Sequence, residues 1–282
     1  IININFKGNS RQSFSKSGGV IEKSNGTATK GEIRFSILEN AIVDFGESVL
    51  NGDASFTVAA GARLITRHAE GIAATGSTGS IQVTGTRTYS NDADYAYAGS
   101  LHQVTGLGLP GIVRRLIIDN ASGVQSGAGV TLSRATTINK ELVLSDGFLQ
   151  TSATNMITIV DGAGAIASGN SFVAGPMRKT GRSAFTFPTG WSGIDGGRIP
   201  IGISSMSEAS TIQAEYKRAP ATNKGSTIKA PLHHISYCEY WEMFPTTGSL
   251  KAIVTMYRNS HSNCNPVSVV QDLFTFRVAR SD

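Results

Sequence analysis

Two aspartates in the segment Asn91-Asp92-Ala93-Asp94-Tyr95 have the spacing most typical of a functional acidic site in this chain. In an extended strand, residues i and i+2 point to the same face, so Asp92 and Asp94 would lie together. Clustered carboxylates can bind calcium, and glycosidases use two carboxyl groups about 5 to 9.5 Å apart. A solvated turn gives the same pattern. We favour the turn, because the glycine-aspartate nonapeptide of calcium-binding solenoids is absent.

Aromatic residues provide a second candidate site. Tyr89, Tyr95 and Tyr97 form the densest aromatic cluster of the N-terminal region, and Tyr95 and Tyr97 share one face if the segment is a strand. Such a pair can stack on sugar rings when it is exposed, or fill the core when it is not. Trp191 lies in the glycine-rich segment Thr189–Gly193 and is the better candidate for an exposed contact. Tyr95, Tyr97 and Trp191 are therefore the candidate ligand contacts.

Histidine chemistry is the third possibility. The pair His233-His234 follows Pro231 and could supply a base for a nucleophile, but the sequence has no Gly-x-Ser-x-Gly elbow to provide one. His261 and this pair lie near the two cysteines in sequence, yet none falls at the spacing of a zinc finger. We predict no catalytic residue, no metal site and no cofactor.

The elements that would position these residues are short strands. From residue 1 to about 170, runs with period two and many β-branched residues alternate with turn dipeptides, and no segment has a sustained helical period. With about 20 residues for each turn of a solenoid, this region would hold roughly seven or eight turns. The clearest runs are Ile33–Ile37, Ile81–Val83, Leu116–Ile118, Leu142–Leu144 and Met156–Ile159.

The chain also repeats itself at long range, which is typical of stacked architectures. Phe6-Lys-Gly8-Asn9-Ser-Arg-Gln12 returns 91 residues later as Tyr97-Ala-Gly99-Ser100-Leu-His-Gln103. The segment Phe56–Leu64 returns as Ile157–Ile166 with one inserted residue, at a spacing of 101. We therefore predict an all-β fold, with a parallel β-solenoid over residues 1–170 in which each unit packs only on its neighbours.

The character of the sequence changes after Ser171. Most prolines, both tryptophans and both cysteines lie in residues 171–282, and the glycine-punctuated repeat ends. Strand-like runs spaced by loops over this region predict a second domain, an antiparallel, immunoglobulin-like β-sandwich. Trp241 and the neighbouring aromatics are expected in its core.

Composition and charge limit the classes of partner that we expect. Of the 282 residues, 40% are hydrophobic and only 16% are charged, and 32 are glycine, the profile of a secreted β protein. The net charge of +5 lies wholly in residues 171–282, where 12 basic residues meet 7 acidic ones, but no run of Lys or Arg exceeds two. We predict no nucleic-acid partner. No stretch approaches the roughly 20 apolar residues of a membrane helix, so we predict no membrane span.

Both ends of the sequence read as interrupted strands. The chain opens with the alternating run Ile1–Phe6, without an initiator Met or a leader, and closes soon after the alternating run Phe274–Arg280. We expect it to be a mature or trimmed part of a longer protein.

Several segments resemble the repetitive regions of very large secreted surface proteins of Bacteroidetes, and the sequence downstream resembles the domain that follows such repeats, ahead of a sorting signal for type IX secretion. The resemblance implies an exported, cell-surface or released protein, often adhesin-like. No sorting domain and no recognisable catalytic or carbohydrate-binding module accompanies the repeats. The segments that carry the resemblance are Asn51–Ala62, Gly79–Tyr89, Gln103–Pro110, Phe172–Lys179, Phe185–Gly190 and Cys238–Trp241.

Because the chain looks exported and holds two cysteines, we predict a disulfide between Cys238 and Cys264. Two buried thiols in neighbouring strands are the alternative. A bridge closing 26 residues would stabilise the fold by roughly 3 kcal/mol in the chain-entropy model.

These observations lead to one functional hypothesis and two alternatives. We expect a non-enzymatic structural or adhesive segment of a large exported bacterial surface protein, with cell-surface glycans or secretion machinery as partners. A carbohydrate-active β-helix enzyme or carbohydrate-binding module is the alternative from another class. The chain could also be a passenger held by the secretion machinery.

Overall fold

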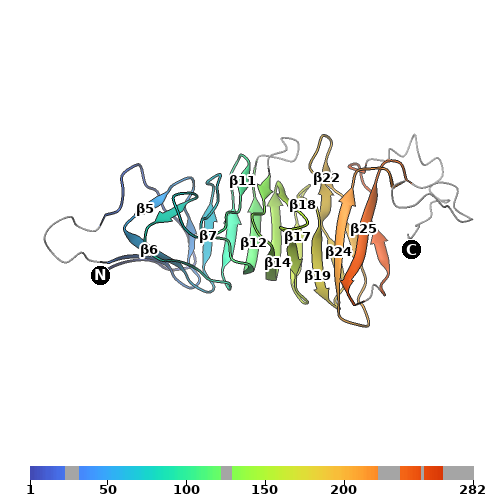
Figure 1. The fold of residues 1–282 in the computed structure, drawn as a ribbon, viewed down its shortest axis with the longest axis horizontal. Coiled ribbons are helices and arrows are strands. Elements are labelled where there is room, and N and C mark those ends of the chain that lie inside the picture. Colours follow the sequence, from blue (N-terminus) through green and yellow to red (C-terminus); the bar gives the residue numbers. More distant parts are fainter. Residues whose placement is uncertain (23–31, 122–128, 222–235, 249–250, 263–282) are drawn as a thin grey trace, which may run out of the picture.

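The computed structural model describes residues 1–22, 32–121, 129–221, 236–248 and 251–262. These residues form an elongated, all-β structure in which strands succeed one another along the long axis, from the N-terminal end to the C-terminal end (Figure 1). No α-helix occurs among the described residues. The all-β class predicted from the sequence is confirmed, and several of the sheets are parallel.

Three parallel arrays build most of the structure, together with the two-stranded parallel pair β5 (Leu50–Gly52) and β8 (Ile81–Val83). The first array holds β1 (Ile2–Phe6), β3 (Ile33–Ile37), β6 (Ala54–Val58) and β9 (Arg87–Tyr89). The large sheet holds β2 (Arg11–Ser13), β4 (Ile42–Asp44), β7 (Arg63–Thr66), β10 (Asp94–Tyr97), β12 (Ile112–Asp119), β14 (Thr136–Asp146), β16 (Ile157–Ile159), β17 (Gly164–Ala167) and β19 (Met177–Gly181). The third array holds β11 (Gln103–Val104), β13 (Val130–Thr131), β15 (Phe148–Gln150), β18 (Phe172–Ala174) and β21 (Thr189–Trp191).

Alternate residues of these strands point inward and form rows across neighbouring strands. In the large sheet Leu64, Tyr95, Leu116 and Leu142 are aligned by register, and all four are buried. Burial of a large apolar side chain contributes roughly 1.5 to 3 kcal/mol, so each strand adds a similar increment of stability to the stack.

Aromatic rings connect the inner rows of the N-terminal half. Each ring contacts the next at a centroid distance between 4.6 and 6.5 Å, mostly edge to face, which is a favoured arrangement. The chain of contacts therefore places Tyr95 inside the core. The rings, in order of contact, are Phe6, Phe14, Phe45, Phe56, Tyr89 and Tyr95.

The same turn precedes β4, β7 and β17. Its third residue has positive φ, 63° at Asn40, 74° at Gly61 and 78° at Gly162, which explains the choice of Asn and Gly there. A buried alanine follows each time and donates its N–H to the carbonyl three residues earlier, at 3.0, 3.2 and 3.1 Å. The repeat of Phe56–Leu64 as Ile157–Ile166 lies on this turn, whereas the repeat that begins at Phe6 and Tyr97 spans strands of different sheets.

The sheets continue across residue 170. β16 pairs with β19 and β18 with β21, both in parallel, and one buried apolar core runs from Ile33 to Ala214. Antiparallel pairing begins where β19 meets β24 (Ser210–Lys217), which pairs with β25 (Tyr240–Thr247). Further antiparallel pairs join β21 to β22 (Gly197–Arg198), and β20 (Phe185–Phe187) and β26 (Val254–Met256) to β23 (Ile201–Ile203). The division at residue 171 and the immunoglobulin-like sandwich stay predictions.

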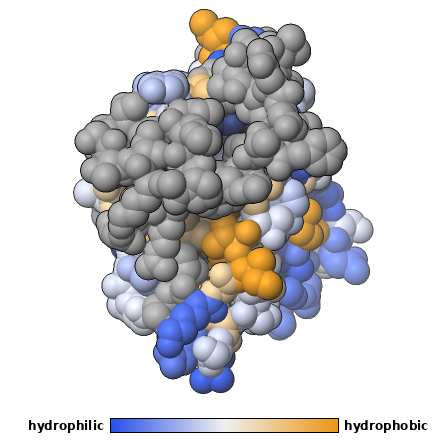
Figure 2. Space-filling model, turned by 90° about the vertical axis from the view of Figure 1, so that its right-hand side faces the viewer, coloured by the Kyte–Doolittle hydropathy of each residue, from blue (hydrophilic) through white to orange (hydrophobic). Residues whose placement is uncertain are grey.

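Viewed from the C-terminal end, the described surface shows apolar patches between hydrophilic ones (Figure 2). β25, β26 and the residues next to β26 contribute several exposed apolar side chains. They include Phe244, Ile253, Val254 and Tyr257.

Candidate functional site

The outer face of the large sheet carries a row of charged side chains. The register aligns one outward residue from each successive strand, so that residues 21 to 31 positions apart in the sequence become neighbours. A parallel stack therefore assembles a site that no local motif reveals. The row consists of Arg11, Ile42, Arg63, Asp94, Arg115 and Glu141.

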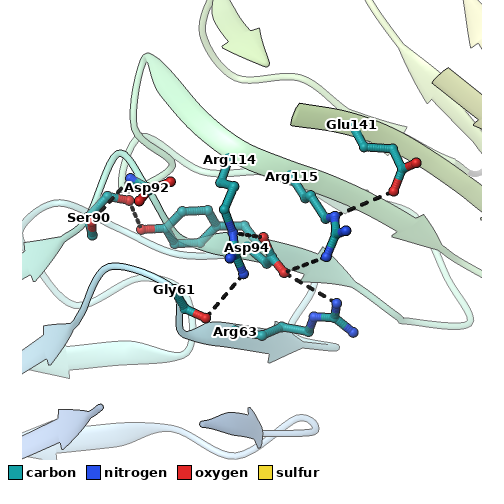
Figure 3. Close-up of polar contacts among 9 residues, drawn as sticks. Gly61, Arg63, Ser90, Asp92, Asp94, Arg114, Arg115 and Glu141 are labelled. Carbon is teal, nitrogen blue, oxygen red and sulfur yellow. Dashed lines mark hydrogen bonds and ion pairs between the residues drawn. The ribbon is translucent and has the colours of Figure 1, made fainter. Parts of the chain in front are cut away.

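Asp94 is the centre of this row (Figure 3). Its side chain is only 2% exposed because three guanidinium groups surround it. Arg114 Nε donates to Asp94 Oδ1 at 2.8 Å, Arg63 Nη2 donates to Oδ2 at 3.2 Å, and Arg115 Nη1 lies 3.6 Å from Oδ2. Charge-assisted hydrogen bonds of this kind are among the strongest in proteins. The oxygens of Asp94 are thus committed to arginine.

The flanks of the cluster fix the arginines in turn. Arg114 Nη2 also donates to the carbonyl of Gly61 at 3.1 Å, which joins the cluster to the turn before β7 (Figure 3). Arg115 Nε lies 3.4 Å from Glu141 Oε2, an ion pair without hydrogen-bond alignment. Arg63 Nε is buried and has no hydrogen-bond partner in the described structure.

Asp44 forms a second cluster on the same face. Arg11 and Arg67 both donate to its Oδ2, the latter at 3.3 Å, and the N–H of Gly46 donates to Oδ1 at 2.8 Å. Partial burial acts to raise the pKa of Asp44, but the hydrogen bonds from Arg11, Gly46 and Arg67 outweigh it, so that the pKa lies below its ordinary value. The carboxyl group is therefore held in its charged form.

The face is hollowed over β10. Ala96 occupies the position that Ile65 and Ile117 fill on the two flanking strands, and Ala98 follows it along the chain. A hollow of about 440 Å³ lies over these alanines, and a second hollow of about 320 Å³ lies beside Asp94; Arg63 and Arg115 line both. The larger one has an apolar floor and a charged rim. We call this hollow the sheet groove; it is lined by Arg11, Arg63, Ile65, Ala96, Ala98, Arg115, Ile117, Asp119, Glu141, Val143 and Ser145.

Asp92 and Asp94 do not form a calcium site in this structure. Asp92 lies in the exposed turn before β10, where its N–H bonds to Ser90 Oγ at 3.1 Å, while Asp94 is buried beneath its arginines. Calcium would have to displace those guanidinium groups to reach the carboxylate. Within the described residues, no three His, Cys, Asp or Glu side chains are grouped closely enough to hold a metal ion.

The tyrosine platform does not form. Tyr95 and Tyr97 lie on one face of β10, as the alternation predicts, but that face is the inner one and both rings are buried. Their hydroxyls donate to the carbonyls of Ser90 and Thr105, each at 2.8 Å. Burial raises the pKa of both phenols well above 10. Ligand contact by Tyr95 and Tyr97 is therefore not proposed further; the alternative, that these rings fill the core, agrees with their burial.

Trp191 ends β21 and is 38% exposed. Its indole lies against Gly193, where a Cβ atom would come within 2.3 Å of Trp191 Nε1. A larger residue at position 193 would displace the ring from this position. Trp191 is available at the surface, and its contact with a ligand stays a prediction.

Several candidates from the sequence lie outside the described residues. They are Cys264, His233 and His234, so the disulfide between Cys238 and Cys264 stays a prediction, as does the absence of a role for the histidine pair. Cys238 itself lies next to Ser236, with the sulfur 3.7 Å from Ser236 Oγ. Trp241 is half-buried in β25 and contacts the ring of Tyr216 at a centroid distance of 5.4 Å.

Comparison with known proteins adds no relative: no protein-family model, no curated protein and no solved structure matches the chain. The part of the chain that is described contains no helix with the length and apolarity needed to cross a membrane.

The sequence did not identify the arginines of the outer face as site residues. Their signal was weak but present, because Arg114 and Arg115 interrupt the apolar strand Ile112–Asp119. Which acid they would meet depends on the register with β10, and that register was not predicted.

Proposed function

We propose that this chain is a non-enzymatic structural or adhesive segment of a large exported bacterial surface protein, a cargo of type IX secretion, built on a β-solenoid. The observation that carries the proposal is the continuous parallel pairing from β2 to β19 along one long sheet. Such a stack gains length by adding strands, and each strand packs mainly on its neighbours. This is the property that a stalk or spacer needs.

The stack can present side chains at regular intervals as well as provide length. Successive strands of a sheet lie about 4.8 Å apart, so outward residues form evenly spaced rows along the axis. The row from Arg11 to Glu141 is one example, and its charges are held in place by ion pairs. An adhesive role uses such a row as a contact surface.

The geometry of the acidic groups favours this role over a glycosidase. Hydrolysis of a glycosidic bond needs one carboxyl group that can donate a proton and a second that acts as base or nucleophile. Asp44 has a lowered pKa, which is the wrong direction for a general acid, and the oxygens of Asp94 are occupied by arginines.

The test is a glycan-array and whole-cell binding assay on the purified chain, with the same glycans assayed in parallel for cleavage. Saturable binding without new chain ends supports the adhesive role. Binding to whole cells without binding to any glycan on the array would point to a protein partner. Release of new reducing ends or unsaturated products would overturn the proposal in favour of a carbohydrate-active enzyme.

A further inference from the structure

We propose that the sheet groove and the arginines around it bind an acidic polysaccharide that lies along the axis of the stack. The proposal rests on the adhesive role proposed above and names the chemical class of its ligand. It places the contact on the outer face of β2, β7, β10, β12 and β14, away from Tyr95 and Tyr97.

The cations of this face are regularly spaced along the sheet. Arg11, Arg63 and Arg115 lie in one row on every second strand, with Ile42 and Asp94 between them. Two strand spacings amount to about 9.6 Å. The Cα atoms of these arginines therefore recur at a fixed interval along the long axis, while the guanidinium groups of Arg63 and Arg115 converge on Asp94 Oδ2, at 3.2 and 3.6 Å. Cations anchored at such intervals suit an extended ligand whose anionic groups also recur.

The charge balance of this face favours an anionic ligand. Five arginines of this face form ion pairs with only three carboxylates, Asp44, Asp94 and Glu141, and Asp119 on the rim of the groove is a fourth, which leaves a surplus of one positive charge. Arg11 and Arg67 are the most open, with side chains 53% and 43% exposed. Their guanidinium groups have N–H donors to spare, and guanidinium matches the planar fork of a carboxylate. The five are Arg11, Arg63, Arg67, Arg114 and Arg115.

The arginines of this face are preorganised. Each arginine is already held by Asp44 or Asp94, so less side-chain entropy is lost when a ligand binds. The groove supplies room, because about 440 Å³ falls in the range of small-molecule sites, and its floor of Ile65, Ala96 and Ile117 offers apolar contact to sugar rings.

The groove chemistry favours a polysaccharide with widely spaced charges over a nucleic acid. No aromatic side chain lines the groove to stack on bases, and Asp119 and Glu141 on its rim repel a densely charged strand. Asp94 also separates two of the arginines in the row. A chain with one carboxylate on every second sugar fits this alternation.

The test measures binding of hyaluronan oligosaccharides, which carry one carboxylate per disaccharide, by isothermal titration calorimetry at several salt concentrations. Dextran serves as the neutral probe and single-stranded DNA as the dense polyanion. The unaltered chain is expected to bind hyaluronan saturably, to ignore dextran, and to bind DNA more weakly. Equal affinity for DNA, or no saturable binding of hyaluronan, would overturn the proposal.

The variants Arg11→Gln and Arg67→Gln remove the most exposed cations while leaving Asp94 fully paired. Each is expected to weaken hyaluronan binding about tenfold and to reduce its salt dependence, since one charge-assisted hydrogen bond is lost. Arg34→Gln is the matched control, because Arg34 lies on β3 in another sheet, is 46% exposed and carries the same charge.

If Arg34→Gln weakened hyaluronan binding as much as Arg11→Gln or Arg67→Gln, the binding would depend on the overall positive charge of the protein. That result would overturn the proposed site. Thermal melting of each variant excludes unfolding as the cause. If whole-cell binding persists in Arg11→Gln while hyaluronan binding is absent from the unaltered chain, the adhesive role stands and only the ligand assignment fails.

Discussion

The inner and outer faces of β7, β10, β12 and β14 use alternate residues of the same strands in opposite ways. The inner residues Leu64, Tyr95, Leu116 and Leu142 are apolar or aromatic and buried, whereas the outer residues Arg63, Asp94, Arg115 and Glu141 alternate in charge. Both rows are produced by a single register. Stability and surface chemistry are therefore coupled, because a shift of the strand register by one residue would exchange the two faces.

The largest effect is expected when the inner row is broken. Leu116→Ala should lower the free energy of unfolding by about 2 to 5 kcal/mol, because the buried side chain has neighbours on both sides in its row. Ile112→Ala, on the exposed part of the same strand, should change it by no more than about 0.5 kcal/mol. Urea unfolding measures both; similar losses for the two variants would refute the assignment of inner and outer residues.

A smaller loss is expected when the centre of the outer row is removed. Asp94→Asn leaves three arginines without their shared anion. Breaking a fully buried ion pair costs about 3 to 5 kcal/mol, but these arginines are 24 to 30% exposed and partly hydrated, so we expect about 1 to 3 kcal/mol. Asp92→Asn, in the exposed turn, is the control and should be close to neutral. An Asp94→Asn variant as stable as the control would show that the cluster contributes nothing to folding.

The smallest effect concerns Asp44 and depends on pH. The folded-state pKa of Asp44 is below its unfolded value of about 3.9, so its contribution to stability is present above that pH and is lost as the pH falls towards the folded-state pKa. Asp44→Asn should therefore cost less than about 1 kcal/mol at pH 7, since Arg11 and Arg67 are exposed, and progressively less as the pH falls below about 3.9. Melting temperatures of the two proteins from pH 2 to 7 should converge at the acidic end; a gap that widens there contradicts the pKa direction.

Much of the strand pattern could be predicted from the sequence. Alternation of apolar residues predicted strands at Ile33–Ile37 and Met156–Ile159, which the structure has at Ile33–Ile37 and Ile157–Ile159, and the repeat from Phe56 to Leu64 marked a turn that recurs in the structure. These are local features, set by side-chain period and by the need for positive φ at residues such as Gly61.

The register and the site could not be predicted in the same way. Neighbours in the outer row are 31 residues apart from Arg11 to Ile42 but 21 from Ile42 to Arg63, because loops of different length join the strands. The same two spacings return from Arg63 to Asp94 and from Asp94 to Arg115, so this row has a period of 52 residues up to Arg115, which the repeats found at 91 and 101 residues did not reveal. The burial of Tyr95 and Tyr97 could not be predicted either, since alternation places them on one face of the strand but does not say which face is the inner one.

Small-angle X-ray scattering on the purified chain tests most directly whether the protein is an extended stack of parallel strands. A compact globular chain of 282 residues would have a radius of gyration of about 19 Å. For an extended stack we expect a clearly larger radius of gyration. We also expect a pair-distance distribution with an early maximum, set by the cross-section, and a long linear decline. A symmetric distribution with a radius near that of a globule would contradict it.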